Sequence, residues 1–476
     1  MTNQHLSLQY FSGNSADLVA DVAAARLLSW LYLFYAIPMI LFLALATPPF
    51  QVTDEYSHAL RADQLSRGVL VSPRLGGRID GGLRSFGHLY EEMQFRYEVK
   101  QTEELARKVI ALTWHVPDED ENFQNSAQYG PFLYLPQAAG IWFGKLADFS
   151  PFFTFLASRL VNAAVSILVA FVAIRRCRRG LALLFTTVLL PMTASEFGSM
   201  SQDALIISLS LLVAANASKI LAESRASRVW EFALFVAVVV TTTLARPSQF
   251  ALAPLGLLYL TSADTSWRPK ALIAAVGIAL IMAWLVLLPK LMPEGPSGVS
   301  VSAQLLEIVK QPLLLPTVIY NTIRVQAFWL LETLVGLRGW LDTRLPHWFT
   351  WTAAGVLVCS WFTPGNRRPW FLPAAVGLVT FVAVLLNIAA ALYASWTQVG
   401  KMTIDGVQGR YILPVFPLLA FASPQYGPTL SRLLSPSWLA VTALPIVSMA
   451  VLPAAVMERY YGSWANMQAV LKIWYY

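Results

Sequence analysis

Long apolar runs separated by short polar stretches dominate the pattern of this chain. The first run covers residues 27–46, and several others approach the roughly 20 residues that a helix needs to cross a membrane. The pattern therefore predicts an all-α polytopic membrane protein. Besides the first run we predict ten spanning helices, at 154–174, 181–197, 203–222, 230–245, 249–262, 270–291, 348–363, 370–394, 411–423 and 437–457.

Two further apolar stretches contain residues that interrupt helices. The stretch 131–147 is short and includes Pro136 and Gly140, and the stretch 312–336 includes two prolines and Arg324. If neither crosses the membrane, the bundle has 11 spanning helices, and if both cross it has 13. In the second case the helices between the two stretches are inverted.

Lysine and arginine clusters in the short loops distinguish these two arrangements, because cytoplasmic loops carry an excess of both residues. The clusters lie at 175–179, 219–228, 268–270 and 367–368. All four face the cytoplasm only with 11 spanning helices. We therefore predict a cytoplasmic N-terminus and place residues 48–153 outside the cytoplasm.

A long polar segment, residues 48–130, follows the first run. It holds 13 of the 27 acidic residues but only 9 of the 34 basic ones, and its glycine pairs are typical of turns. We expect a loop of mixed α/β structure. The chain then divides into an N-terminal segment with the first helix (1–47), an extracytoplasmic loop with a membrane-embedded helix (48–153), a central bundle (154–292), a second extracytoplasmic loop with an interfacial helix (293–347), and C-terminal helices with a tail (348–476).

Composition and charge indicate which kinds of molecule the protein contacts. Hydrophobic residues make up 56% of the chain, and the formal net charge is +7. Because the positive excess lies outside the 48–130 segment, we attribute it to cytoplasmic loops and contact with membrane lipids, and expect no nucleic-acid surface. The two cysteines do not predict a disulfide framework.

Charged residues gather directly after the first apolar run, where two prolines stop the helix. Asp54, Glu55, His58, Arg61 and Asp63 fall within ten positions. A partly desolvated carboxylate at a membrane surface can act as a general base. We therefore take Asp54, and after it Glu55, as the candidate catalytic residues.

A structural role competes with this interpretation. Thr53 or Asp54 follows a proline turn and stands where the N-cap of a helix over 55–67 is expected. Capping and catalysis are compatible in one residue.

Four polar motifs share one side of the membrane in the 11-helix arrangement. They are the segments 47–58, 196–204, 336–348 and 405–411. Polar chemistry gathered on one face of a helical bundle predicts a functional site there.

Motifs along most of the chain resemble those of a family of bacterial polytopic membrane proteins of unknown function, domain of unknown function 2142. Three residues depart from the family pattern, since Thr53, Tyr56 and Gln202 stand where proline is expected. The motifs are a diproline-aromatic segment before Asp54-Glu55 with His58 and Arg61, YGPFLYLPQAAG (129–140), SRLVNA (158–163), SQDAL (201–205), GWLDTRLPHW (339–348) and QGRYILP (408–414).

That family resembles the GT-C glycosyltransferase superfamily, whose members carry a catalytic acid in the first extracytoplasmic loop. The resemblance implies a GT-C-like helical bundle in the bacterial inner membrane with an extracytoplasmic active site. It also implies an inverting transfer of a sugar from a polyprenyl-phosphate donor to a cell-envelope glycan or lipid-linked acceptor. The competing hypotheses are a transporter or flippase of lipid-linked sugars and a non-catalytic subunit of a polysaccharide export complex.

Several residues are candidates for binding the substrates. Arg410, with Lys401 and Arg246 as further candidates, could hold the donor phosphate or anchor lipid headgroups. Asp203 could bind an acceptor hydroxyl, orient Arg61, or simply favour the start of its helix. The full substrate-binding set is His58, Arg61, Gln202, Asp203, Arg246, Asp342, Lys401, Arg410 and Tyr411.

No cofactor is predicted with certainty. The acidic run at 118–121 offers the oxygen ligands of a divalent cation, although such runs are more often solvated. His58, His88 and His115 do not have the spacing of a metal site.

Overall fold

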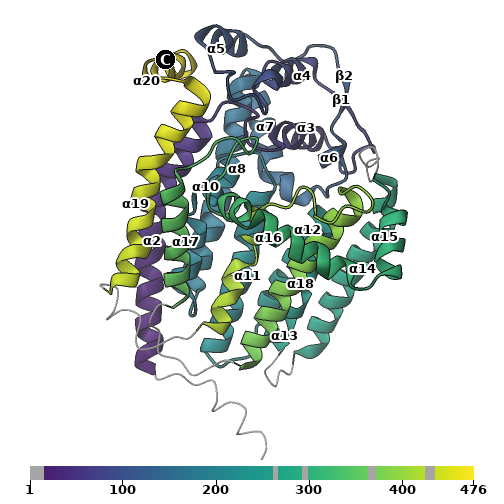
Figure 1. Ribbon diagram of the computed structural model, residues 1–476, viewed down its shortest axis with the longest axis vertical. Coiled ribbons are helices and arrows are strands. Elements are labelled where there is room, and N and C mark those ends of the chain that lie inside the picture. Colours follow the sequence, from purple (N-terminus) through teal and green to yellow (C-terminus); the bar gives the residue numbers. More distant parts are fainter. Residues whose placement is uncertain (1–14, 261–265, 292–298, 363–370, 424–434, 476) are drawn as a thin grey trace, which may run out of the picture.

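The computed structural model describes residues 15–260, 266–291, 299–362, 371–423 and 435–475. The protein is an all-α polytopic membrane protein whose long helices run side by side, with a polar layer at one end of the bundle (Figure 1). In the described ranges, six helices are long and apolar enough to cross a membrane. They are α2 (Ser15–Ala46), α8 (Pro151–Arg176), α11 (Asp203–Ala222), α14 (Trp267–Leu291), α18 (Phe371–Ser395) and α19 (Pro436–Val456).

These helices differ in how far the protein covers them. In α11, 89% of the most apolar window is buried inside the protein, whereas the figure for α14 is 17%. Helix α11 therefore lies at the centre of the bundle, and α14 presents most of its apolar surface outward, where lipid would cover it.

Other apolar runs form elements that are short or interrupted. Helices α12 (Val229–Ala245) and α17 (His347–Trp361) are short, and α15 (Val301–Lys310) precedes α16 (Leu314–Val335), which has a non-helical residue at Gln326. The expected helix at 181–197 is instead two helices, α9 (Leu181–Val188) and α10 (Pro191–Phe197). The break falls at Leu190, which is extended because a residue before proline is pushed out of the α region.

Prolines also explain two further differences. The expected helix at 249–262 is a 3₁₀ segment, η3 (Pro247–Leu255), followed by α13 (Gly256–Leu260), and residues 261–262 lie outside the described chain. The expected helix at 411–423 is a pair of 3₁₀ turns, η4 (Gly409–Ile412) and η5 (Phe416–Ala422). Each run contains prolines, which remove backbone donors from a continuous α-helix.

The polar segment has the predicted mixture of helices and strands. The strands pair antiparallel, with Gly76 opposite Asn122 and Ile79 opposite Glu119. The elements are α3 (Glu55–Ser66), β1 (Gly76–Ile79), α4 (Gly81–His88), η1 (Glu91–Met93), α5 (Glu103–Ile110), β2 (Glu119–Asn122), α6 (Gln124–Ala127), η2 (Phe132–Tyr134) and α7 (Leu135–Leu146). Helix α7 would extend about 18 Å, less than the roughly 30 Å of a bilayer core.

The chain returns to this polar layer at its C-terminal end. After α19 a π-helical turn, η7 (Met457–Tyr461), leads into α20 (Trp464–Tyr475), which packs near α5 (Figure 1). Trp474 is buried and its ring lies 5.2 Å from that of Phe152 in α8. The layer is thus built from segments at both ends of the sequence.

Candidate functional site

Asp54 occupies the turn that leads from α2 into α3. Its backbone is left-handed, with φ 61°, a conformation that costs a non-glycine residue about 1 kcal/mol or more. Its side chain makes no capping hydrogen bond, and the Thr53 hydroxyl donates to the Gly339 carbonyl at 2.7 Å. Neither side chain caps α3 as expected, so the half-exposed Asp54 carboxylate remains available.

Glu55 lies in a different environment. It is fully buried and receives two hydrogen bonds from Arg159, at 2.8 and 2.6 Å, and one from the Met200 amide at 3.0 Å. Arg159 also donates to the carbonyls of Ala44 and Thr47 at the end of α2. Both oxygens of Glu55 are occupied, so these contacts favour a structural role for the pair, holding α2, α3 and α8 together, and leave Asp54 as the first candidate for the base.

Arg61 is also structural. Its guanidinium is buried and donates to the carbonyls of Val69 at 3.0 Å and Leu70 at 2.5 Å. Asp203 is paired elsewhere and does not orient it. These contacts support the loop that follows α3, and the substrate-binding role expected of Arg61 stays a prediction.

His58 lies one turn beyond Asp54 on α3. Its Nδ1 is 2.6 Å from the Tyr134 hydroxyl, and its ring stacks on that of Tyr129. Burial lowers the pKa of His58, against the opposing effect of the carboxylates of Asp54 and Asp203. A neutral imidazole can accept a hydrogen bond through one ring nitrogen and donate through the other, and the tautomer decides whether Nδ1 accepts from the Tyr134 hydroxyl or donates to it.

Two buried ion pairs complete the cluster. Arg246, at the end of α12, lies 2.8 Å from Asp203 at the start of α11, and Arg410 in η4 lies 2.8 Å from Glu196 in α10. The ring of Tyr411 is 4.8 Å from the Arg246 guanidinium and 5.5 Å from that of Arg410. Burial alone would lower the pKa of Arg410, but Glu196, Tyr411, Asp203 and Asp54 raise it well above its usual value.

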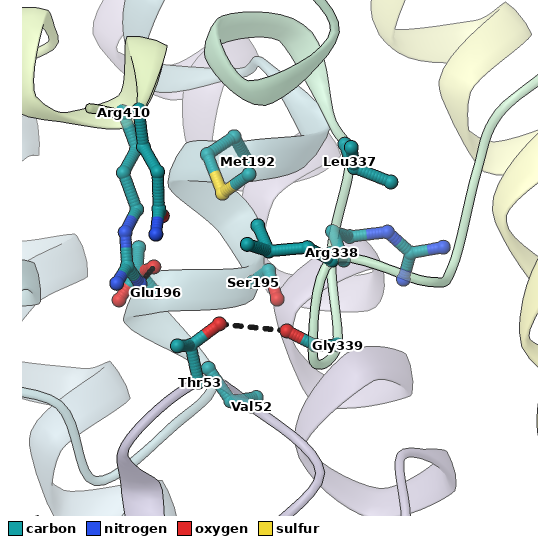
Figure 2. Close-up of a pocket in the computed structure, with 11 residues that line it drawn as sticks. Val52, Thr53, Met192, Ser195, Glu196, Leu337, Arg338, Gly339 and Arg410 are labelled. Carbon is teal, nitrogen blue, oxygen red and sulfur yellow. Dashed lines mark hydrogen bonds and ion pairs between the residues drawn. The ribbon is translucent and has the colours of Figure 1, made fainter. Parts of the chain in front are cut away.

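A small pocket adjoins the second pair (Figure 2). Thr53, Glu196, Arg338 and Arg410 are among its lining residues, and they come from the four segments that the sequence placed on one face. In Figure 2 the side chains of Glu196 and Arg410 meet, whereas Arg338 points away from them. The pocket thus has an ion pair on one wall and the loop after α16 on the other.

Three glutamines near these segments have polar atoms without partners. The amides of Gln202 and Gln249 are fully buried and make no hydrogen bond to any described residue, and the Gln408 Oε1 is likewise unpaired. Buried amides normally find partners in the protein, in water or in a ligand. Gln202 belongs to the predicted substrate-binding set, and Gln249 and Gln408 share its lack of partners.

Two expected members of the site lie elsewhere. Lys401 pairs with Asp405 at 2.5 Å on an exposed loop, and Asp342 pairs with buried Arg459 at 2.7 Å. These two ion pairs are distinct from those of Arg246 and Arg410. The substrate-binding role expected of Lys401 and Asp342 stays a prediction.

The acidic run 118–121 is largely taken up by arginines. Arg84 pairs with Glu119 and Glu121, and Arg67 pairs with Asp118 at 3.3 Å. The described ranges hold no group of three or more histidine, cysteine, aspartate or glutamate side chains that could bind a metal ion.

The comparison with protein families identifies the chain. The model of the family described as "Predicted membrane protein (DUF2142)" matches residues 34–419. The chain belongs to this family. The match includes every residue of the cluster, from Asp54 to Tyr411. No curated protein and no solved structure matches the chain.

Proposed function

We propose that this DUF2142 protein is a GT-C-type glycosyltransferase that moves a sugar from a polyprenyl-phosphate donor to an extracytoplasmic acceptor. One observation carries the proposal: an available carboxylate, Asp54, adjoins a buried cluster containing two arginines, Arg246 and Arg410. Transfer from a lipid phosphate needs both kinds of group, a base for the acceptor and cations for the leaving phosphate.

The proposed step balances without a cofactor. The Asp54 carboxylate takes the proton of an acceptor hydroxyl while that oxygen forms a bond to the anomeric carbon. The bond between the anomeric carbon and the phosphate oxygen breaks, and its electron pair leaves with the lipid phosphate. The anomeric configuration inverts, as expected for a single displacement.

The paired residues support this step in distinct ways. The Arg410 Nε has no hydrogen-bond partner among the described residues and can donate to a phosphate oxygen. Asp203 and Gln202 at the start of α11 suit an acceptor hydroxyl. Tyr411, between the two arginines, offers a face on which a sugar ring can stack.

The proposed location is the bacterial inner membrane, with the polar layer outside the cytoplasm. Reporter fusions test this placement. A reporter active only outside the cytoplasm should be active within residues 100–125 and silent near Arg178, and activity near Arg178 would contradict the orientation.

A reconstituted assay tests the activity itself. The purified protein in liposomes is given a radiolabelled polyprenyl-phosphate sugar and extracts of cell-envelope glycans as acceptors. Release of free polyprenyl phosphate with labelled acceptor supports transfer. Movement of intact donor across the bilayer, without release, would instead show transport and overturn the proposal.

A further inference from the structure

Arg338 is a buried cation without a counter-charge. Only 4% of the residue is exposed, and its Nε and Nη2 atoms are buried with no hydrogen-bond partner in the described chain. Its guanidinium forms no ion pair with any described carboxylate. Burial lowers its pKa to about 10, so the group is still charged at neutral pH.

The nearest acid along the loop does not compensate it. Asp342 is engaged with Arg459, at 2.7 Å between Oδ2 and Nη2 and 2.9 Å between Oδ2 and Nε. An unpaired buried charge costs several kcal/mol, and proteins normally supply a partner for it. Buried Arg159 and Arg410 each have a glutamate, and buried Arg61 donates to two backbone carbonyls, whereas the Nε and Nη2 of Arg338 have neither kind of partner in the described chain.

The loop that carries Arg338 is held rigidly. Its backbone amide donates to the Thr343 carbonyl at 3.2 Å, and Gly339 has φ 68°. A Cβ at Gly339 would lie 2.6 Å from the Tyr460 hydroxyl, so the turn also requires glycine for space. The backbone that carries the unpaired guanidinium is therefore a fixed feature of the fold.

We propose that Arg338 is the centre of a second anion site, which binds the phosphate group of a ligand beside the pocket of Figure 2. The guanidinium fork matches two phosphate oxygens, and Nε and Nη2 form one edge of that fork. Because Arg338 points away from Arg410 in Figure 2, this site is separate from the arginine that faces the proposed donor. It does not depend on the glycosyl transfer.

A lipid is the expected source of the phosphate. Trp340, two residues further on, is half-buried, and its ring centroid lies 4.9 Å from that of Phe95, which is 67% exposed. A tryptophan beside an exposed aromatic ring favours the headgroup region of a membrane, where phosphates are the abundant anions. A phosphate on a soluble ligand is the other source, and the experiment separates the two.

The test uses the full-length protein in a phosphate-free maltoside detergent at constant ionic strength. Inorganic phosphate and the short-chain lipid dihexanoyl phosphatidic acid are titrated separately, and the shift in unfolding temperature gives a dissociation constant. We expect saturable stabilisation of the wild type by the lipid probe. A tighter constant for the lipid than for inorganic phosphate assigns the site to a lipid, and equal constants assign it to the phosphate group alone.

Two variants locate the binding. In Arg338→Met the dissociation constant should rise at least about tenfold, as expected for lost charge-assisted hydrogen bonds. The same variant without ligand should unfold at the wild-type temperature or above, because the uncompensated charge is gone. Arg344→Met, an exposed arginine of the same loop that pairs with Glu332, is the matched control and should change the constant less than about twofold.

Two results would overturn the site. One is the absence of saturable stabilisation of the wild type by either probe. The other is a wild-type constant in Arg338→Met. If Arg338→Met does not fold, Arg338→Lys replaces it, and a wild-type constant there also contradicts a paired guanidinium contact.

Discussion

Two buried ion-pair regions border helix α3, and their difference separates structure from chemistry. On one side Glu55 and Arg159 satisfy each other, and their remaining hydrogen bonds go to backbone groups. On the other side the pairs around Arg246 and Arg410 adjoin a pocket, the Asp54 carboxylate and amides without partners. Charge at membrane depth is costly in both regions, but only the second leaves groups that a ligand could satisfy.

Asp54 and Glu55 are adjacent in sequence but have different surroundings, so proximity in sequence does not predict whether a carboxylate is structural or available to a ligand. The backbone at Asp54 is left-handed, and its side chain makes no capping hydrogen bond, whereas Glu55 is bonded to Arg159 and the Met200 amide. The comparison is open to test by changing one region at a time.

The largest expected effect is on turnover. Asp54→Asn keeps the size of the side chain and removes the base, so turnover should fall by about 10²–10⁴-fold. Turnover is measured as release of polyprenyl phosphate from the sugar donor. Asp120→Asn, an exposed acid of strand β2, is the control and should retain wild-type turnover. Wild-type turnover in Asp54→Asn would remove the base from the mechanism.

The second effect is on stability. Glu55→Gln leaves Arg159 buried without its counter-charge and should lower the free energy of unfolding by about 3–5 kcal/mol. Denaturant titration of the purified protein measures the loss, with exposed Glu91→Gln as control. The folded fraction of Glu55→Gln should keep near-normal turnover. Normal stability with abolished turnover would reverse the roles assigned to the two regions.

The third effect is on donor use. Arg410→Lys keeps a positive charge opposite Glu196 but loses the planar pair of donors. The apparent KM for the donor should rise by roughly 10–100-fold, which corresponds to losing a charge-assisted hydrogen bond. Turnover is measured against donor concentration for the wild type, Arg410→Lys and Arg410→Ala. If lysine behaves as the wild type while alanine fails, the site needs charge alone and the bidentate contact is excluded.

The smallest effect concerns pH. The pKa of His58 in the folded protein lies below its usual value of 6.5, so the unfolded chain binds the proton first as the pH falls. Stability should therefore decrease as the pH falls through 6.5, and level off below the folded pKa. His58→Gln should show a shallower loss between neutral and acidic pH in thermal unfolding. An unchanged slope would mean that the pKa of His58 is the same in the folded and unfolded states.

Sequence reasoning recovered the long helices and much of the cluster. Asp54, His58, Asp203, Arg246 and Arg410 were identifiable because ionisable residues are rare in an apolar chain and conspicuous at helix ends. The prediction that these residues share one face followed from placing the lysine and arginine clusters of the short loops on the other side of the membrane. Sequence-wide hydropathy did not show that the runs after Pro247 and Pro414 are 3₁₀ segments, since prolines change backbone geometry without changing apolarity.

Pairing between charges was beyond the sequence. Arg159 lies within an apolar helix, and its choice of Glu55, 104 residues away, depends on how α3 and α8 pack. Whether Arg338 has a counter-charge likewise depends on tertiary packing, which the sequence does not reveal. A signal for Glu196 did exist, because an acidic residue within the apolar run 181–197 is unusual.

The link between Thr53 and Gly339 has a consequence for biosynthesis. It joins residues 286 positions apart, and a bond from Trp340 to the Phe50 carbonyl spans 290. The turn that carries Asp54 leaves the ribosome early, but its partners emerge only after most of the helices have been translated. The first helix and its acidic turn therefore lack these contacts until residues beyond 340 have been synthesised. In ribosome-stalled chains shorter than this, the turn should be cleaved by proteases that cannot reach it in the finished protein.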